Sequence, residues 1–126
     1  MSALKRMESE GRQLINGYGA GGFRISGVTY ARAVLVFPKR AIELDVQTLE
    51  ELTIDHLHPL VEGDEKTEIL LVGCGKRLQF LPEHLQTGLS MVGIAADPMD
   101  SGAAARTYNM LMMEDRRVAA LLLPVL

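Results

Sequence analysis

The segment Ile69–Arg77, with the sequence ILLVGCGKR, constrains the fold of this chain more than any other. Four consecutive apolar residues lead into Gly73, Cys74 and Gly75. A short apolar run that ends at glycine is typical of a strand buried on both faces, as in the middle of a parallel sheet. Ligands of open α/β sheets bind just beyond the carboxyl ends of such strands. We therefore expect a central strand over 68–72 and, if the protein has a site, a site directly after it.

The second half of the chain alternates between strand and helix patterns. In order, the patterns predict a helix over 82–87 before Gly88, a strand over 91–96 before Asp97-Pro98, a helix from Asp100 or Ser101 to about Asp115, and a buried strand over 118–123. With the strand over 68–72, this is a β-α-β-α-β order with short connections. Such an order favours parallel strands joined by right-handed crossovers.

The first half is rich in β patterns. It predicts a hairpin or two edge strands around Phe23–Tyr30, a buried strand over 33–37, a strand with one wet face over 41–46, and helical structure over 48–62 that is interrupted near Thr53 and closed at Gly63. Thr48 and Glu51 have the spacing of a capping box at the start of that helical segment. The whole pattern predicts one α/β domain over 13–126, after a loosely ordered segment over 1–12.

Composition excludes several classes of function. The chain has 126 residues and a formal net charge of −3, whereas general nucleic-acid binders are usually basic. No window has the length of a signal peptide's apolar region or of a membrane span, so we expect no membrane insertion and a cytoplasmic location. The single cysteine cannot form an internal disulfide, which fits a reducing compartment.

Two glycine-rich segments are candidates for phosphate binding. Gly17–Gly22 formally satisfies G-x-G-x-x-G, but a strand pattern follows it where the dinucleotide motif requires a helix. We therefore interpret Gly17–Gly22 as a β-turn or a bulge. The segment after the central strand has a better context, but Leu78 occupies the position of the third glycine. Its backbone N–H groups could hold an anion, and a tight turn with two solvated bases is the alternative.

The candidate ligand site therefore combines the turn with the acidic segment after the next strand. If the two strands are adjacent and parallel, this site contains Gly73, Cys74, Gly75, Lys76, Arg77, Asp97 and Ser101. Lys76 or Arg77 would then lie within reach of Asp97, in a structural role as readily as in a ligand site.

No complete catalytic set accompanies the site. Cys74 could be a nucleophile only with a histidine base, and none of the three histidines can be placed beside it by spacing. We interpret Cys74 as a buried, unreactive thiol, and we expect no catalytic residues, no metal site and no cofactor. Asn109 is a poor helix former in mid-helix, so we expect its side chain to hydrogen-bond to a neighbouring loop.

Three segments together resemble a known family: INGYGAGGFRI (15–25), ILLVGCG (69–75) and AARTYNMLMMEDRRVAALLLP (104–124). It is a small family of bacteria, archaea and eukaryotes that carries the label "domain of unknown function". Its mitochondrial relative is an assembly factor of respiratory complex I. The resemblance implies a three-layer α/β fold, with a central mixed, mostly parallel sheet flanked by helices and an extra β layer from the N-terminal half. It supplies no catalytic residues.

Two functions remain open at this point. The first is a non-enzymatic accessory or assembly protein that binds a protein partner in the biogenesis of a membrane complex. Self-association into a homo-oligomer is compatible with it. The second is a small-molecule or anion-binding protein, or an enzyme, that uses the cleft after the strands over 69–72 and 91–96.

Overall fold

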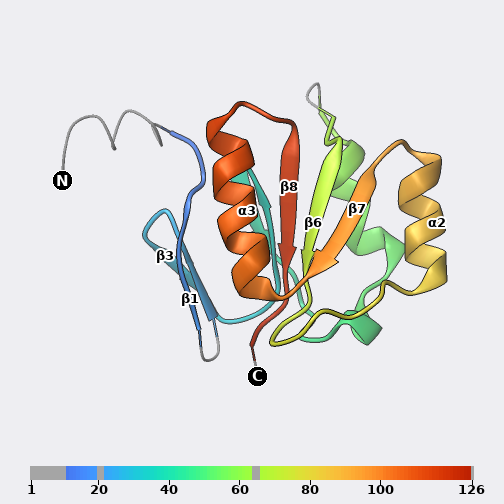
Figure 1. Ribbon diagram of the computed structural model, residues 1–126, viewed down its shortest axis with the longest axis horizontal. Helices are drawn as coiled ribbons and strands as arrows, with labels where there is room; N and C mark the ends of the chain where they lie inside the picture. The colour runs from blue at the N-terminus through green and yellow to red at the C-terminus, as the bar shows by residue number, and fades with distance from the viewer. Residues whose placement is uncertain (1–10, 20–21, 64–65, 126) are drawn as a thin grey trace.

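The computed structural model describes residues 11–19, 22–63 and 66–125. Its centre is a five-stranded sheet with the strand order β5-β4-β8-β6-β7 (Figure 1). The strands are β4 (Val34–Phe37), β5 (Arg40–Glu43), β6 (Ile69–Gly73), β7 (Ala95–Met99) and β8 (Val118–Leu122). β6 pairs in parallel with both β7 and β8, whereas β4 pairs antiparallel with both β5 and β8. The sheet is therefore mixed, with two parallel and two antiparallel pairings.

The middle strands are the continuous apolar runs of the sequence. Every residue of β4 and β8 is buried, and β6 is buried from Leu70 onward. These strands need apolar side chains on both faces because the sheet is covered on both sides. The predicted buried strands over 33–37, 68–72 and 118–123 are confirmed.

This sheet is the middle one of three layers (Figure 1). One face packs against α3 (Ser101–Met113) and a second, three-stranded sheet formed by β1 (Ile15–Gly19), β2 (Gly22–Ile25) and β3 (Val28–Tyr30). The other face packs against the 3-10 helices η1 (Leu49–Glu51) and η2 (Ile54–Val61) and against α2 (Glu83–Met91). The predicted three-layer fold with an extra β layer from the N-terminal half is confirmed.

Polar side chains fasten the extra β layer to α3. Asn109 accepts a hydrogen bond from the backbone N–H of Ile15 through Oδ1 at 2.9 Å and donates from Nδ2 to the Ile15 carbonyl at 2.8 Å. The β1–β2 register shifts between Ile15 and Gly17, directly before the predicted turn or bulge over Gly17–Gly22, whose residues 20–21 lie outside the described part of the chain. The expected bond of Asn109 is present, but its partner is a strand rather than a loop. The fully buried Tyr108 donates a second bond, to the Gln13 carbonyl at 2.9 Å.

The first-half elements differ in detail from those predicted. The strand predicted over 41–46 begins and ends earlier, as β5. The helical segment predicted over 48–62 is two 3-10 helices, interrupted at Leu52 and Thr53, and Pro59 prevents a regular α-helix because it has no N–H to donate. The predicted capping box is present: Glu51 Oε1 accepts the Thr48 N–H at 3.0 Å.

The second-half elements differ more. The helix predicted over 82–87 continues to Met91, and Gly88 lies inside it, where a side chain would collide with Ile54 at 2.8 Å. The glycine that follows the helix end is Gly93, at φ +79°. The next strand therefore begins at Ala95 rather than at 91. It runs through Pro98, because an edge strand tolerates a missing N–H.

Within the described ranges, no helix combines the length and the apolar character needed to span a bilayer. The prediction of a cytoplasmic location goes beyond this finding and stays a prediction.

Candidate functional site

The turn after β6 is closed by hydrogen bonds to its neighbours. The Cys74 N–H donates to the Met99 carbonyl at 2.8 Å, and the Gly75 N–H donates to Ser101 Oγ at 2.8 Å. Ser101 Oγ in turn donates to the Leu123 carbonyl at 2.7 Å. One buried hydroxyl at the start of α3 thus joins the ends of β6 and β8, and no space is left at its position.

Gly73 makes this closure possible. A Cβ atom on Gly73 would lie 2.9 Å from the Ser101 Cα and 3.1 Å from Leu122 Cδ2. Gly75 follows at φ +87°, where other residues are strained. The two glycines therefore serve close packing and a sharp turn. The N–H groups of Cys74 and Gly75 both already have protein acceptors, so they are not available to hold an anion.

Cys74 is 3% exposed, and its Sγ lies 3.4 Å from the Val72 carbonyl and 3.4 Å from the Gln79 carbonyl. Burial raises the pKa of the Cys74 thiol. A thiolate is the reactive form of cysteine, so both the burial and the raised pKa oppose reactivity.

The seven predicted site residues are only partly brought together. Gly73, Cys74, Gly75 and Ser101 form the closed turn, and Lys76 and Arg77 follow it on the surface. Asp97 is the exception: it lies within β7, paired with Leu71, because the strand starts later than predicted. Among the described residues, no ion pair joins Asp97 to Lys76 or Arg77. Asp100 caps α3, accepting the Ala103 N–H at 2.8 Å.

An apolar loop projects from this closed turn. Leu78 is 52% exposed and Phe80 is 87% exposed, and both follow directly after the exposed bases Lys76 and Arg77. Sequence reasoning missed this feature because a Leu and a Phe before a predicted helix can pack against that helix as readily as they can be exposed to solvent. Single exposed apolar residues are normal, but an almost fully exposed Phe beside a second exposed apolar residue is characteristic of a contact surface.

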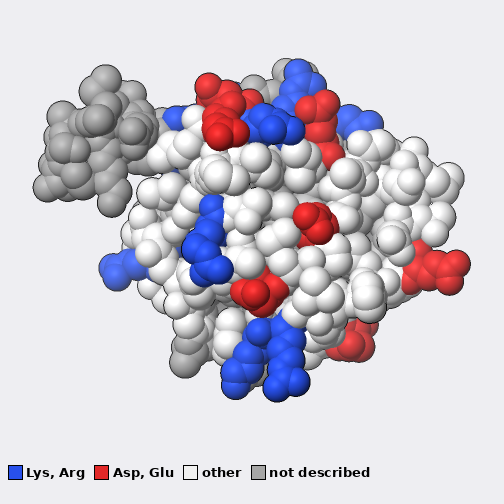
Figure 2. All heavy atoms as spheres, in the orientation of Figure 1, with Lys and Arg blue, Asp and Glu red and all other residues white. Residues whose placement is uncertain are grey.

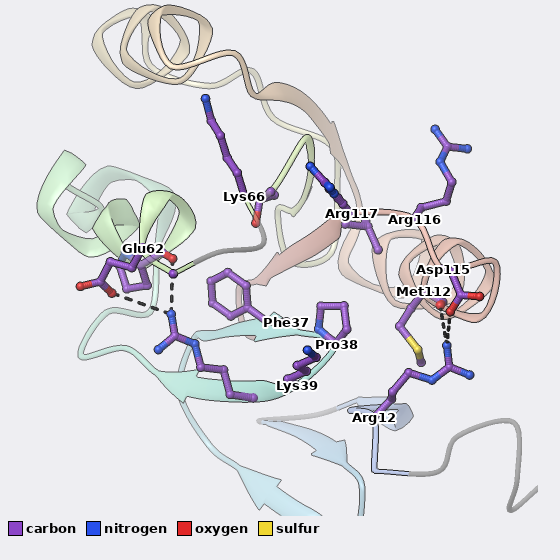
Figure 3. Close-up of a pocket in the computed structure, with 15 residues that line it drawn as sticks. Arg12, Phe37, Pro38, Lys39, Glu62, Lys66, Met112, Asp115, Arg116 and Arg117 are labelled. Carbon is purple, nitrogen blue, oxygen red and sulfur yellow. Dashed lines mark hydrogen bonds and ion pairs between the residues drawn. The ribbon is translucent and has the colours of Figure 1, made fainter.

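A pocket lies at the opposite end of the sheet (Figure 3). It has a volume of about 780 Å³ and lies where β4 ends and where β6 and β8 begin. Its described lining includes six bases: Arg12, Lys39, Arg40, Lys66, Arg116 and Arg117. Sequence reasoning missed the pocket because these bases come from four separate segments. The available signal was that two of the segments, Lys39-Arg40 and Arg116-Arg117, are basic pairs at strand ends.

Figure 2 shows acidic and basic side chains mixed along the upper edge of one face, a group of basic side chains at the lower edge, and separate charged side chains between them. Within the described ranges, no group of His, Cys, Asp or Glu side chains has the arrangement of a metal site.

Several solved structures have a fold similar to that of this chain. Two crystal structures match closely: an outer membrane protein from Bartonella henselae, with a TM-score of 0.81 and 38% identity, and a Bordetella parapertussis protein, with a TM-score of 0.80 and 33% identity. Each match covers 90% of this chain and 96% of the other. A Bordetella pertussis protein described as an Mth938-like domain also matches, with a TM-score of 0.78 and 29% identity over 90% of this chain and 86% of that one.

Relatives by sequence extend the comparison to eukaryotes. An uncharacterized protein of Rhodobacter capsulatus is 37% identical over 111 residues, which are 88% of this chain and 84% of the relative. NADH dehydrogenase (ubiquinone) 1 alpha subcomplex assembly factor 3 of Xenopus tropicalis is 27% identical, over 98% of this chain and 68% of the relative. The human protein of the same name is 26% identical, over 97% of this chain and 66% of the relative.

The family described as "Protein of unknown function (DUF498/DUF598)" matches residues 15–123, from the first residue of β1 to the residue after β8. The match thus includes the closed turn, the exposed loop and most of the pocket lining. The resemblance inferred from the three sequence segments is confirmed, and this chain belongs to the DUF498/DUF598 family.

Proposed function

We propose that this protein is a non-enzymatic accessory factor that binds a protein partner through the loop Lys76–Phe80. The observation that carries the proposal is the 87% exposure of Phe80 in a loop that begins at a turn held by hydrogen bonds. Interfaces are enriched in aromatic residues and Arg, and a few such anchors supply most of the binding energy.

The base of the loop supports this role. Gly73, Cys74 and Gly75 are buried, and their hydrogen bonds to Ser101 and Met99 tie the loop to α3 and β7. A loop held in this way loses little conformational freedom when it binds, which favours affinity. Leu78 and Phe80 then present apolar surface, and Lys76 and Arg77 add positive charge beside it.

The family comparison supports an assembly role for the same interaction. Several relatives carry the name of an assembly factor of NADH dehydrogenase, and such a factor acts by contact with other proteins. A role in the biogenesis of a membrane complex is the specific form of the proposal for this chain.

Affinity capture from native extract tests the proposal. The tagged protein should recover a stoichiometric partner, and Phe80→Ser should reduce the affinity of the purified pair by about thirtyfold, the effect of removing one interface anchor. The matched control is Met110→Ser, because Met110 is 56% exposed on α3 and lies outside the loop. Recovery of the protein alone, or equal binding by both variants, would contradict the proposal.

The alternative function, a small-molecule or anion-binding protein with a site at Gly73–Arg77, Asp97 and Ser101, stays a prediction. The hydrogen bonds made by the turn count against it. A ligand-induced shift in melting temperature that disappears in a Lys76→Ala/Arg77→Ala double variant would favour it.

A further inference from the structure

We propose that the pocket lined by Phe37, Lys39, Thr67, Arg117 and Val118 binds a small organic anion, in which a phosphate or carboxylate group is carried on an apolar body. This site lies at the end of the sheet opposite to the loop Lys76–Phe80, and it is independent of the protein partner proposed for that loop.

The position and size of the pocket are those of a ligand site. It lies where β4 ends and where β6 and β8 begin, and η2 and the end of α3 form its side walls (Figure 3). Its volume of about 780 Å³ falls within the range of about 300–1,000 Å³ that is usual for small-molecule sites. Elements from both halves of the chain hold the walls in place.

The charge of the lining opposes that of the whole molecule. The chain has a net charge of −3, but the described lining residues include six bases against only Glu62 and Asp115. Gathering like charges around a hollow is unfavourable in the empty state, since the field between low-dielectric walls is concentrated. A bound anion removes that repulsion, so the charge pattern selects for anions.

Two of the bases are already held by the walls. Arg12 donates to the Met112 carbonyl at 3.2 Å and pairs with Asp115 at 2.9 Å. Arg40 lies 3.8 Å from the Glu62 carboxylate, and its guanidinium is 4.9 Å from the centre of the Phe37 ring. Both lining carboxylates are therefore paired with these two arginines, and within the described residues neither carboxylate forms an ion pair with Lys66, Arg116 or Arg117.

Arg117 is the base best placed for a ligand. Arg116 and Arg117 precede β8, and the Val118 N–H donates to the Arg116 carbonyl at 2.9 Å, so the backbone turns at Arg117. In Figure 3, the Arg117 side chain lies on the Lys66 side of the pocket, whereas the guanidinium of Arg116 lies farther from Lys66 and from Phe37. Within the part of the chain that the structure describes, the Arg117 guanidinium makes no hydrogen bond and no ion pair.

A hydroxyl group adds a second polar contact. Thr67 is 4% exposed and lines the pocket just before β6. Its hydroxyl makes no hydrogen bond to any described residue, yet it is not among the fully enclosed polar atoms that lack a partner. Thr67 is the described lining residue that carries a hydroxyl, and this hydroxyl can donate to an oxyanion in the pocket.

The remaining lining is apolar, and this decides the kind of ligand. Phe37 and Val118 are 9% and 1% exposed, and Pro38 and Pro59 continue the same surface. Inorganic phosphate would make no contact with this apolar part of the lining. A ligand with both an oxyanion and an apolar chain uses both parts of the lining, because burying each methylene contributes to affinity.

The test is a titration of the full chain with hexyl phosphate and, separately, with hexanoate, followed by amide shifts in two-dimensional NMR. We expect saturable shifts at Phe37–Arg40, Thr67 and Val118 with one of the two probes, which identifies the anionic group. Affinity should fall about fourfold for each methylene removed from the chain. Potassium chloride at the same ionic strength is the control for screening.

Matched variants locate the site. Arg117→Gln should weaken binding of the probe by about tenfold, the effect of one charge-assisted hydrogen bond, and Thr67→Val by about threefold. Arg116→Gln removes the same charge from the neighbouring residue and should change the affinity by less than about twofold. The shifts of each variant without ligand report whether it is folded.

Three results would overturn the proposal. The first is the absence of saturable shifts with both probes, or equal shifts with potassium chloride. The second is an equal loss of affinity in Arg116→Gln and Arg117→Gln, which indicates unspecific attraction. The third is binding of an acidic decapeptide but of neither probe, which would make the pocket a groove for a protein segment.

Discussion

The two ends of the central sheet differ in what fills them. At the carboxyl end of β6, the hydroxyl of Ser101 occupies the space beside Gly73, and it bonds to Gly75 and to the Leu123 carbonyl. At the amino end of β6, basic side chains surround a pocket of about 780 Å³. General rules for parallel sheets place ligands at the carboxyl end. Here a side chain of the protein takes that place, and the open space lies at the other end.

This difference shows that strand direction indicates where a site can lie, but does not determine whether space for a ligand is left there. A glycine after a buried strand allows something to approach the backbone closely. In this protein the approaching group is α3, which packs its first residue onto Gly73. At the other end, β4 runs antiparallel to β8 and contributes Phe37 and the bases after it. The following predictions test the contrast between a filled end and an open end.

The largest effect is expected for Gly73→Ala at the filled end. The new methyl group would lie 2.9 Å from the Ser101 Cα, a backbone atom that cannot move without shifting α3. We expect a loss of about 3 kcal/mol in the free energy of unfolding, measured with urea. Gly63→Ala at the open end is the control. It adds strain at φ +82° but meets no atom within 4 Å, so a loss of only about 1 kcal/mol is expected. Equal losses would remove the contrast.

Ser101→Ala should have the next largest effect. It leaves the Gly75 N–H and the Leu123 carbonyl buried without their partner, which costs about 2 kcal/mol in the free energy of unfolding. Thr67→Val at the open end should cost less than about 0.5 kcal/mol, because its hydroxyl makes no hydrogen bond to a described residue. Urea unfolding of both variants measures the difference, and a larger loss for Thr67→Val would contradict the assignment of the two ends.

Alkylation of Cys74 measures how tightly the filled end is closed. The folded protein should react with iodoacetamide at least about tenfold more slowly at pH 8 than the unfolded chain, because the thiol is buried and its pKa is raised. Cys74 is the single cysteine, so mass spectrometry of the intact chain reports it directly.

The same shift in pKa has a consequence for stability. A group whose pKa is raised in the folded state keeps its proton when the unfolded chain has lost it, so stability falls as the pH rises above the thiol's ordinary value near 9. Cys74→Ala should therefore show a smaller loss of melting temperature between pH 8 and pH 10 than the wild type. In the alkylation experiment, rapid reaction of Cys74 in the folded protein would indicate that the turn after β6 is open.

The smallest effect on stability is expected for Arg117→Gln at the open end. The Arg117 side chain has no partner among the described residues, so its replacement should change the free energy of unfolding by less than about 0.5 kcal/mol. Thermal unfolding at low salt checks this. A loss above about 1 kcal/mol would show that Arg117 holds the fold and would weaken its proposed role in ligand binding.

The sequence predicted the strands well where burial on both faces leaves a continuous apolar run. β4, β6 and β8 were predicted for this reason. The long helix α3 was predicted because its capping residue, Asp100, directly precedes an apolar stripe at helical spacing. The prediction failed around α2 because two glycines compete as helix ends. Only the contact of Gly88 with Ile54, 34 residues away in the chain, shows that Gly88 lies inside the helix.

The sequence placed the turn after β6 beside the start of α3, but it did not predict correctly which side chains lie there. Gly73–Gly75 and Ser101 meet as expected, whereas Asp97 moves into β7 because that strand starts four residues later than predicted. The pocket could not be predicted, since its lining comes from segments that are neighbours only after β4 has inserted beside β8.

The sequence by itself determined the α/β class, the buried central strands and the family, because these depend on local apolar runs and on motifs that lie within short segments. The tertiary structure decided which end of the sheet is filled and which is open. That outcome depends on how α3 approaches Gly73 and how β4 pairs with β8, and such long-range packing has no signature in any single segment.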